Sequence, residues 1–244
     1  MTRGWRQAMT DLDRMDPVQA LRALSTIVLG DHSFEAVLQR TAEIAQDTIP
    51  GAHDVSVTLQ EGAPKTVAST GRLATLVDET QYEEDEGPCL QAMRSGRTIV
   101  VADQTTENRW PGYDPRATAA GVRSSCSVPM QANGEFIGAL NAYGIETHAF
   151  DDAAVAVAQD LAGYAGIVLN NAGLYFTAAT HAEQMAEAMR SRAVIEQAKG
   201  ILMGGRRCTA DEAFEILARI SQDSHRKLRD VAAALVRDAV SGGN

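Results

Sequence analysis

Residues 54–60 alternate between polar and apolar side chains, with Val55, Val57 and Leu59 on one side of the chain. A period of two is typical of a β-strand with one buried face. Turn-forming residues follow at 61–64, so this strand and the next are expected to form a hairpin. A second hairpin is expected further along, with Ala132-Asn133-Gly134 as its turn. The predicted strands cover residues 54–60, 65–69, 98–102, 125–131 and 135–143.

Apolar residues at helical spacing predict two helices before the first strand. Pro17 opens the first helix in a position that tolerates proline, and Gly30 ends it. Ser33 is expected to cap the second helix. Residues 72–96 are predicted to be mostly helical, with an interruption at the acidic run that ends in Gly87-Pro88. Strand pairs flanked by helices indicate an α+β domain with a central antiparallel sheet.

A long helix is predicted over residues 151–203, which contain no proline. Alternating steps of four and three residues from Ala154 to Ala193 meet only apolar side chains, a spacing typical of a coiled-coil contact. This register favours pairing with a second copy of the chain. The alternative is that so alanine-rich a segment gives an unbroken apolar register without any partner.

Two short helices are predicted after the Gly204-Gly205 pair. Thr209 and Glu212 have the spacing of a capping box at the start of the first one. Ser224 is expected to cap the second. The expected buried stripes contain Ala213, Leu217 and Ile220, with Phe214 beside them, and then Leu228, Val231, Ala232, Leu235 and Val236.

Composition excludes several classes of protein. The chain has 244 residues, of which 45% are hydrophobic and 22% charged, so it can fill one large or two modest cores. Its start is polar and unlike a signal peptide, and no obvious membrane span is expected. Three cysteines are too few and too scattered for a disulfide framework or a paired zinc site. We therefore expect a cytoplasmic protein without a metal site.

The formal net charge of -10 speaks against a nucleic-acid partner when the chain is taken whole. The charge is unevenly divided, however. Residues 1–180 hold 12 Lys and Arg against 23 Asp and Glu, whereas residues 181–244 hold 10 against 9. This asymmetry predicts two units with different partners.

The C-terminal unit resembles a known family. The run Ser191-Arg192-Ala193-Val194-Ile195-Glu196-Gln197-Ala198-Lys199-Gly200-Ile201-Leu202-Met203 is similar to the signature of ANTAR domains, and the segments 208–214 and 226–232 match its second and third helices. The resemblance implies a three-helix module that binds paired hairpins in nascent RNA and so prevents a transcription terminator from forming. The implied RNA-binding residues are Arg192, Gln197, Lys199, His225, Arg226, Lys227 and Arg229.

The basic residues also have a simpler interpretation. Arg192 and Lys199 share a helix face, and each is spaced to pair with Glu196 within the helix. The cluster at 226–229 fits a solvated surface, or a helix N-terminus that receives a phosphate. At position 225 the family commonly has Asn where this chain has His225, so RNA affinity is expected to be weaker or dependent on pH.

Residues 17–172 resemble a GAF domain of the kind fused to ANTAR modules in actinobacterial proteins. The resemblance is carried by Gln81-Tyr82, Glu86-Gly87-Pro88-Cys89, Arg109-Trp110-Pro111, Gly121-Val122-Arg123-Ser124, Ser127-Val128-Pro129-Met130 and Gly134-Glu135-Phe136-Ile137-Gly138-Ala139-Leu140-Asn141. It implies a sensory module that holds a small molecule between the sheet and its covering helices. The ligand is unknown, but haem and bilin are not supported, because His53 and His148 are expected at the surface and no attachment motif is present.

Cys89 and Cys126 allow two interpretations. They are either inert core residues or a redox sensor, in which Cys89 is activated near the N-terminus of the helix that Pro88 opens. If both were catalytic, the chain would be a GAF-type free methionine sulfoxide reductase.

Together these observations predict a signal-responsive antitermination regulator that is not an enzyme. Its expected parts are a flexible N-terminus (1–16), a GAF sensory domain (17–172), a helical linker (173–182) and an ANTAR RNA-binding domain (183–240). It is expected to form a homodimer through the long helix. The alternatives are the reductase and a protein-interaction module that does not bind RNA.

Overall fold

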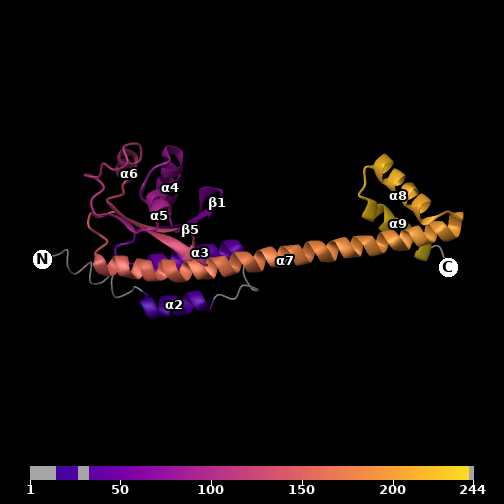
Figure 1. Ribbon diagram of the computed structural model, residues 1–244, viewed down its shortest axis with the longest axis horizontal. Helices are drawn as coiled ribbons and strands as arrows, with labels where there is room; N and C mark the ends of the chain where they lie inside the picture. The colour runs from indigo at the N-terminus through magenta and orange to yellow at the C-terminus, as the bar shows by residue number, and fades with distance from the viewer. Residues whose placement is uncertain (1–14, 27–32, 242–244) are drawn as a thin grey trace. The chain divides into compact units, whose positions relative to one another are not determined.

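The computed structural model describes residues 15–26 and 33–241. The chain divides into two compact units, Met1–Phe176 and Thr177–Asn244, and helix α7 contributes to both (Figure 1). The elements are α2 (Pro17–Ser25), α3 (Phe34–Thr48), β1 (Asp54–Glu61), β2 (Ala63–Ser69), α4 (Arg72–Glu84), α5 (Pro88–Ser95), β3 (Ile99–Val101), α6 (Asp114–Ala120), β4 (Ser124–Ala132), β5 (Glu135–Gly144), α7 (Asp152–Arg206), α8 (Ala210–Ser224) and α9 (Leu228–Ser241).

The first unit is built on a five-stranded sheet with the strand order β2-β1-β5-β4-β3. Every pair of neighbouring strands is antiparallel, which confirms both predicted hairpins and the predicted α+β class. Asn133 and Gly134 in the second hairpin turn both have positive φ angles, of 52° and 85°. Asn-Gly is the pair that tolerates this conformation best, so the turn residues fix the register of β4 against β5.

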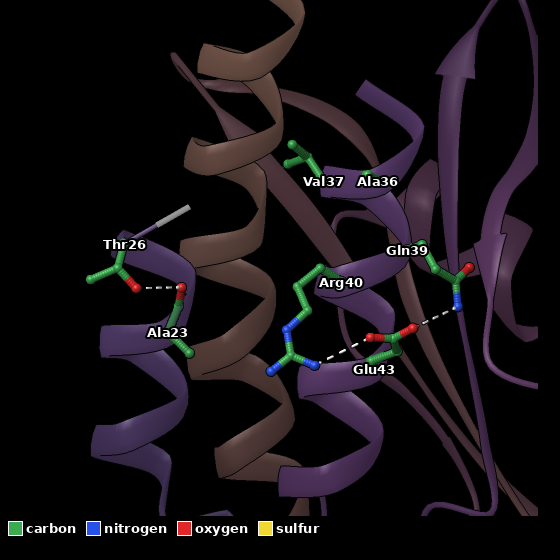
Figure 2. A pocket seen from close by; sticks show the side chains of 7 residues that line it. All are labelled: Ala23, Thr26, Ala36, Val37, Gln39, Arg40 and Glu43. Carbon is green, nitrogen blue, oxygen red and sulfur yellow. Dashed lines mark hydrogen bonds and ion pairs between the residues drawn. The ribbon is translucent and has the colours of Figure 1, made fainter. Parts of the chain in front are cut away.

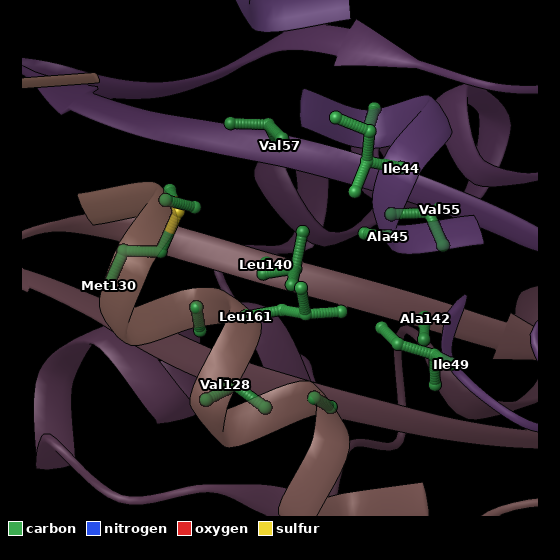
Figure 3. Packing of buried hydrophobic residues seen from close by; sticks show 14 of the residues in the cluster. Ile44, Ala45, Ile49, Val55, Val57, Val128, Met130, Leu140, Ala142 and Leu161 are labelled. Carbon is green, nitrogen blue, oxygen red and sulfur yellow. The ribbon is translucent and has the colours of Figure 1, made fainter. Parts of the chain in front are cut away.

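One face of the sheet is apolar. Val55 and Val57 of β1 and Leu140 of β5 pack there against α3 and the first part of α7, as Figure 3 shows for Ile44, Ile49 and Leu161. The strand periodicity alone predicts this layer, because alternate residues of a strand point to the same face. Figure 1 shows α2 and α3 on this side of the sheet.

The opposite face of the sheet is equally buried. We call it the polar face, because it combines buried polar residues with a second apolar cluster that includes Ile99, Val101 and Tyr143. Its residues include Ser56, Thr58, Ser127 and Asn141, none of which is exposed to solvent. Helices α4 and α5 cover it, and α6 packs against α4. Buried polar groups cost free energy unless they are hydrogen-bonded, so a face of this composition is unusual for a domain core.

The N-terminal helices follow the sequence pattern closely. The Ser33 side chain accepts a hydrogen bond from the Ala36 amide and caps α3, as predicted. Helix α2 ends at Ser25, earlier than the predicted end at Gly30. Gly30 itself lies outside the described residues, and so do positions 1–14 of the expected N-terminus. Helix α6 was not predicted, because a seven-residue helix is too short to show an apolar period.

The second unit is a three-helix module made of the end of α7 with α8 and α9. Its buried residues are Ala198, Leu202, Ala213, Leu217, Val231 and Ala232. The capping box at Thr209 and Glu212 is confirmed. Ile220, expected in the buried stripe, is instead 46% exposed, because it lies beyond the contact with the other two helices.

Ser224 was predicted to cap the last helix, and this was wrong. It is the final residue of α8, where its hydroxyl donates to the Ile220 carbonyl oxygen at 2.5 Å. A serine inside a helix can bond back to the carbonyl four residues earlier, and the sequence does not distinguish this use from capping.

The apolar positions at the start of α7 pack into the core of the sheet unit. Ala154, Ala158, Leu161, Ala165 and Ala172 are buried in that unit's own core, so these positions are not free to contact a second chain. One stretch of α7, of which 39% is buried, is long and apolar enough by length and composition alone to cross a membrane. Such a stretch was not expected from the sequence, but the core helix of a soluble protein has the same composition.

Candidate nucleic-acid interface

The turn between α8 and α9 brings basic residues to one end of the helical module. His225 ends α8 in the left-handed conformation, with φ 51° and ψ 31°. Its amide donates to the Gln222 carbonyl oxygen at 3.3 Å, and the Arg226 amide donates to the Ser221 carbonyl oxygen at 3.2 Å. These bonds close the end of α8 and direct the chain into α9.

Arg226 and Lys227 lie immediately before α9. The Lys227 carbonyl oxygen accepts hydrogen bonds from the Asp230 and Val231 amides, at 2.9 and 3.2 Å, so the first turn of the helix starts here. The N-terminus of a helix carries a partial positive charge that favours anions. Two cations at this end oppose the helix dipole, which makes the end attractive to a phosphate.

Arg229 is held by an ion pair with Glu187 of α7, and its Nε also lies 3.8 Å from Asp230 Oδ1. The pair joins the start of α9 to α7. Arg229 is therefore part of a contact within the protein. It can bind RNA only if a phosphate replaces Glu187 as its partner or binds beside Glu187.

On α7, Lys199 and Arg192 differ in exposure and in their ion pairs. Lys199 Nζ lies 3.0 Å from both carboxylate oxygens of Glu196, and its side chain is only 16% exposed. This is the intrahelical pairing that the spacing offered as the simpler interpretation. Arg192 is exposed and has no ion pair within the described part of the chain.

The predicted RNA-binding residues do not all share one surface. At about 100° per residue, Arg192 and Lys199 lie on one stripe of α7, whereas Gln197 lies roughly 140–160° around the helix. Glu187, which holds Arg229, is also well separated from the Arg192 stripe. The structure therefore brings together Arg226, Lys227 and Arg229, and leaves Arg192 as a separate exposed cation.

Sequence reasoning missed a buried cluster in the sheet unit, around Asp78 of α4. Asp78 accepts hydrogen bonds from the Tyr143 hydroxyl, from Thr66 Oγ1 at 2.7 Å and from Gln81 Nε2 at 3.4 Å. Burial raises the pKa of Asp78 to about 6, although its hydrogen bonds act in the opposite direction. The sequence signal for this cluster was the set of polar residues that alternate with apolar ones along the strands. Alternation alone predicts that such residues face solvent.

Cys89 and Cys126 are both fully buried, on opposite faces of the sheet. Cys126 belongs to the apolar core, whereas Cys89 Sγ lies 3.5 Å from Thr58 Oγ1 on the polar face. Burial raises the pKa of each thiol to about 12. Cys89 does lie at the start of α5, as expected, but desolvation outweighs any helix dipole there, and thiol chemistry requires the thiolate.

A pocket of about 440 Å³ lies between α2 and α3, on the apolar side of the sheet unit (Figure 2). Its charged residues are already paired, with Arg40 Nη1 3.2 Å from Glu43 Oε2 and Gln39 Nε2 3.4 Å from Glu43 Oε1. The segment that joins the two helices, residues 27–32, lies outside the described residues. We therefore assign no ligand to this pocket.

His53 and His148 are exposed, as expected from their positions at strand ends. Within residues 15–26 and 33–241, no group of three or more His, Cys, Asp and Glu side chains is placed to hold a metal ion.

Family comparison agrees with the two units. The family model described as GAF domain matches residues 31–170, and the model described as ANTAR domain matches residues 183–236. The chain belongs to the GAF family, with an ANTAR domain at its C-terminal side. ANTAR domains are RNA-binding antitermination modules and GAF domains are sensory modules, so the chain has a regulatory domain architecture.

Solved structures are similar in fold alone. The phycoerythrobilin-bound GAF domain of a cyanobacterial phytochrome gives a TM-score of 0.52 at 15% identity, covering 66% of this chain and 98% of that one. Free methionine-R-sulfoxide reductase from Neisseria meningitidis, in complex with its substrate, gives 0.50 at 21% identity, covering 65% and 91%. The GAF domain of an Acinetobacter phosphoenolpyruvate-protein phosphotransferase gives 0.50 at 14%, covering 65% and 92%. A comparison with curated protein sequences found no match.

The left-handed conformation of His225 gives a first prediction. Asn and Gly adopt this conformation at low cost, whereas a β-branched residue does not. His225→Gly is expected to raise the free energy of unfolding of the ANTAR domain by about 0.5–1 kcal/mol, and His225→Val to lower it by about 1–2 kcal/mol. Urea denaturation followed by circular dichroism measures both. Equal stability of the two variants would show that the backbone conformation at this position is unimportant.

Proposed function

We propose that this protein is a signal-responsive, cytoplasmic regulator that binds paired hairpins in nascent RNA through its ANTAR domain and thereby promotes transcription antitermination. The GAF domain is the sensor. It takes an unidentified small molecule, and the protein performs no catalysis of its own.

The observation that carries the proposal is the pair Arg226 and Lys227 at the N-terminus of α9. Their charges repel the helix dipole in the free protein and become favourable when an RNA phosphate sits between them and the first amides of the helix. Exposed Arg192 on α7 adds a second basic contact. RNA hairpin loops are recognised by such phosphate contacts together with contacts to unstacked bases.

The test is RNA binding by charge-deletion variants. Arg192→Ala and Lys227→Ala are each expected to weaken the Kd for a two-hairpin RNA roughly fivefold and to reduce the salt dependence of binding by about one unit of slope. Filter binding over 50–300 mM salt measures both quantities. The matched control is Arg237→Ala, which removes an exposed arginine further along α9 and leaves the Kd unchanged. If the full chain does not bind two-hairpin RNA, the protein-interaction alternative replaces this proposal.

We also propose that the protein acts as a homodimer through the exposed part of the α7 register. Met189 is 68% exposed, and Ala182 and Ala193 on the same register are also exposed. Burying such a stripe against a second copy removes apolar surface from water. Met189→Glu is therefore expected to increase the monomer fraction in sedimentation equilibrium. Gln184→Glu, which adds the same charge on another face of α7, serves as the control, and an equal effect of both changes argues against this interface.

Signal transmission is proposed to run along α7, because this helix contributes to the cores of both units. A ligand in the GAF domain would repack the first turns of α7 and alter the presentation of Arg192 and Lys199. Such coupling requires two states that differ in RNA affinity.

The reductase alternative has less support. The reductase from Neisseria meningitidis shares the fold, but at 21% identity this similarity carries no activity. The two thiols lie on opposite faces of the sheet and are buried, an arrangement unsuited to a disulfide-forming pair.

A further inference from the structure

The polar face of the sheet contains more hydrogen-bonding groups than the protein uses. Asn141 Nδ2 donates to Ser56 Oγ at 3.2 Å and to Thr58 Oγ1 at 3.1 Å, but Asn141 Oδ1 has no partner among the described residues. The hydroxyls of Ser125, Ser127 and Tyr113 are also buried and unpartnered in the described part of the chain. Each such group costs about 1–3 kcal/mol when no ligand or water satisfies it. Groups of this kind that persist in a core point to a bound partner.

Asn141 belongs to a hydrogen-bonded network with Asp78, and strand pairing places Ser125 and Ser127 beside it. Thr66 Oγ1 donates to Asp78 and lies 2.8 Å from the Tyr82 hydroxyl, which in turn lies 2.9 Å from Thr58 Oγ1. Thr58 also accepts from Asn141. Ser127 lies directly opposite Asn141 in the pairing of β4 with β5, and Ser125 lies opposite Tyr143. The carboxylate and the unpartnered groups therefore surround the same part of the sheet.

Asp78 differs from the other two buried acids of this unit. Asp54 accepts from the Leu73 and Ala74 amides at the start of α4, and Asp114 accepts from the Trp110 amide and Gln104 Nε2. Both of these carboxylates hold backbone in place. Asp78 accepts only from side chains, and it has no ion pair among the described residues. A buried carboxylate without a cation is expensive, because buried charges are normally paired.

A surface pocket adjoins this network. It has a volume of about 270 Å³ and is lined by Glu86, Gly87, Gln91, Arg94, Ser95 and Trp110. Gly87 has φ 137°, and a Cβ at this position would lie 2.4 Å from Gln81 Oε1. Gln81 in turn donates to both Asp78 and the Tyr143 hydroxyl, so its side chain connects Gly87 at the pocket with the carboxylate.

The charge around the pocket is acidic. Residues 83–86 carry four carboxylates, against which Arg116 pairs with Glu83 and Glu84, and Arg94 pairs with Asp85. The Glu86 carboxylate accepts from the Gly112 amide at 2.5 Å and is not in an ion pair within the described residues. The lining itself holds one acid, Glu86, and one base, Arg94, and the excess of acidic groups lies in the adjoining segment 83–86. Such an excess favours the approach of cations over anions.

We propose that the GAF domain binds a small organic cation, a molecule with a protonated amine whose N–H groups pair with Asp78 and with the unpartnered oxygens of Asn141 and Ser127. The inference rests on the proposed sensory function and names the class of signal. The same cluster holds no Lys, Arg or His in contact with Asp78, so an anionic phosphate or carboxylate ligand has no counter-charge there. The packed cover over Asp78 opens at Gln81 when the cation enters.

The test uses the full chain and a panel of defined probes. Methylammonium, ethanolamine, putrescine and agmatine are the cations, acetamide is the neutral control and acetate is the anionic control. Thermal unfolding is followed by tryptophan fluorescence, since Trp110 is buried in the GAF unit and residues 177–244 contain no tryptophan. Isothermal titration calorimetry then gives the Kd of each probe that raises the unfolding temperature.

At least one cation is expected to raise the unfolding temperature, while acetamide and acetate do not. Asp78→Asn is expected to weaken the Kd of that cation at least tenfold, because an ammonium–carboxylate pair is lost. Ser127→Ala removes a hydroxyl without a partner, so it is expected to leave stability unchanged or higher and still weaken the Kd severalfold. Asp160→Asn, at an exposed position of α7, is the matched control and leaves the Kd unchanged.

Two results overturn the proposal. One is the absence of a thermal shift with every cation, and the other is binding that Asp78→Asn and Ser127→Ala leave intact. RNA binding by the same samples is measured separately. If the RNA Kd is normal but no cation binds, this inference fails while the RNA-binding function stands.

Discussion

Leu217→Ala is expected to lower the free energy of unfolding of the ANTAR domain by about 2–5 kcal/mol. Leu217 is fully buried, and the other fully buried members of its cluster, Ala198, Ala213 and Ala232, are alanines. Few large side chains therefore fill this core, and the cavity left by the truncation cannot be closed by its small neighbours. A module of about 60 residues is close to the lower limit for independent folding, so such a loss unfolds much of the population.

The measurement is urea denaturation by circular dichroism, with the RNA Kd determined on the same samples. RNA binding is expected to fall with the folded fraction of the ANTAR domain, while the tryptophan signal of the GAF unit stays unchanged. Ile220→Ala is the matched control, because it removes an aliphatic side chain from the same helix at a position 46% exposed. It is expected to cost less than about 1 kcal/mol. Equal losses for the two variants would show that the described core does not stabilise the domain.

The second large effect is the dependence of GAF-domain stability on pH. The pKa of Asp78 is raised by burial from 3.8 to about 6, so the folded state binds the proton more tightly than the unfolded state. For such an acid the folded state loses stability as pH rises between about 4 and 6, and the loss is complete above this window. The two pKa values correspond to about 3 kcal/mol at neutral pH.

Asp78→Asn is expected to remove this dependence. Without the titrating group, the free energy of unfolding of the variant relative to that of the original chain rises by about 2.4 kcal/mol between pH 4 and pH 7, because part of the effect is already present at pH 4. Urea denaturation followed by tryptophan fluorescence at pH 4, 5, 6 and 7 measures it. Asp160→Asn, at an exposed position, controls for the loss of one acidic residue. Parallel pH profiles for the Asp78→Asn and original chains would contradict the buried ionisable site.

Much of the fold follows from local pattern. The alternation at 54–60, the Asn133-Gly134 turn and the capping box at Thr209 each specify a structure within a few residues, and all three are present. The errors occur where one residue has two local uses. Ser224 bonds back within α8 instead of capping α9, and Ile220 has the spacing of a core residue but lies beyond the helix contact.

The candidate site was predicted less completely. The resemblance pointed to seven residues. Spacing offered the pairing of Lys199 with Glu196 as one of two interpretations, but it could not show that Arg229 is held by Glu187 of α7. The second of these pairs joins residues that are 42 positions apart, and only the packing of α9 against α7 brings them together. Similarly, His225 was noticed as a departure from Asn, but its left-handed backbone gives the physical reason why Asn suits the position.

By itself the sequence determined the two units, the order of their elements, the long helix and the basic segment that contains Arg226 and Lys227, because periodicity, turn chemistry and charge are properties of neighbouring residues. Only the tertiary structure decided whether each face of the sheet is buried or exposed. Alternation divides β1 and β5 into apolar and polar halves, and a polar half is ordinarily left to solvent. Here α4 and α5 cover it, and this burial turns Asp78 and Asn141 into an incompletely satisfied cluster that no local pattern reveals.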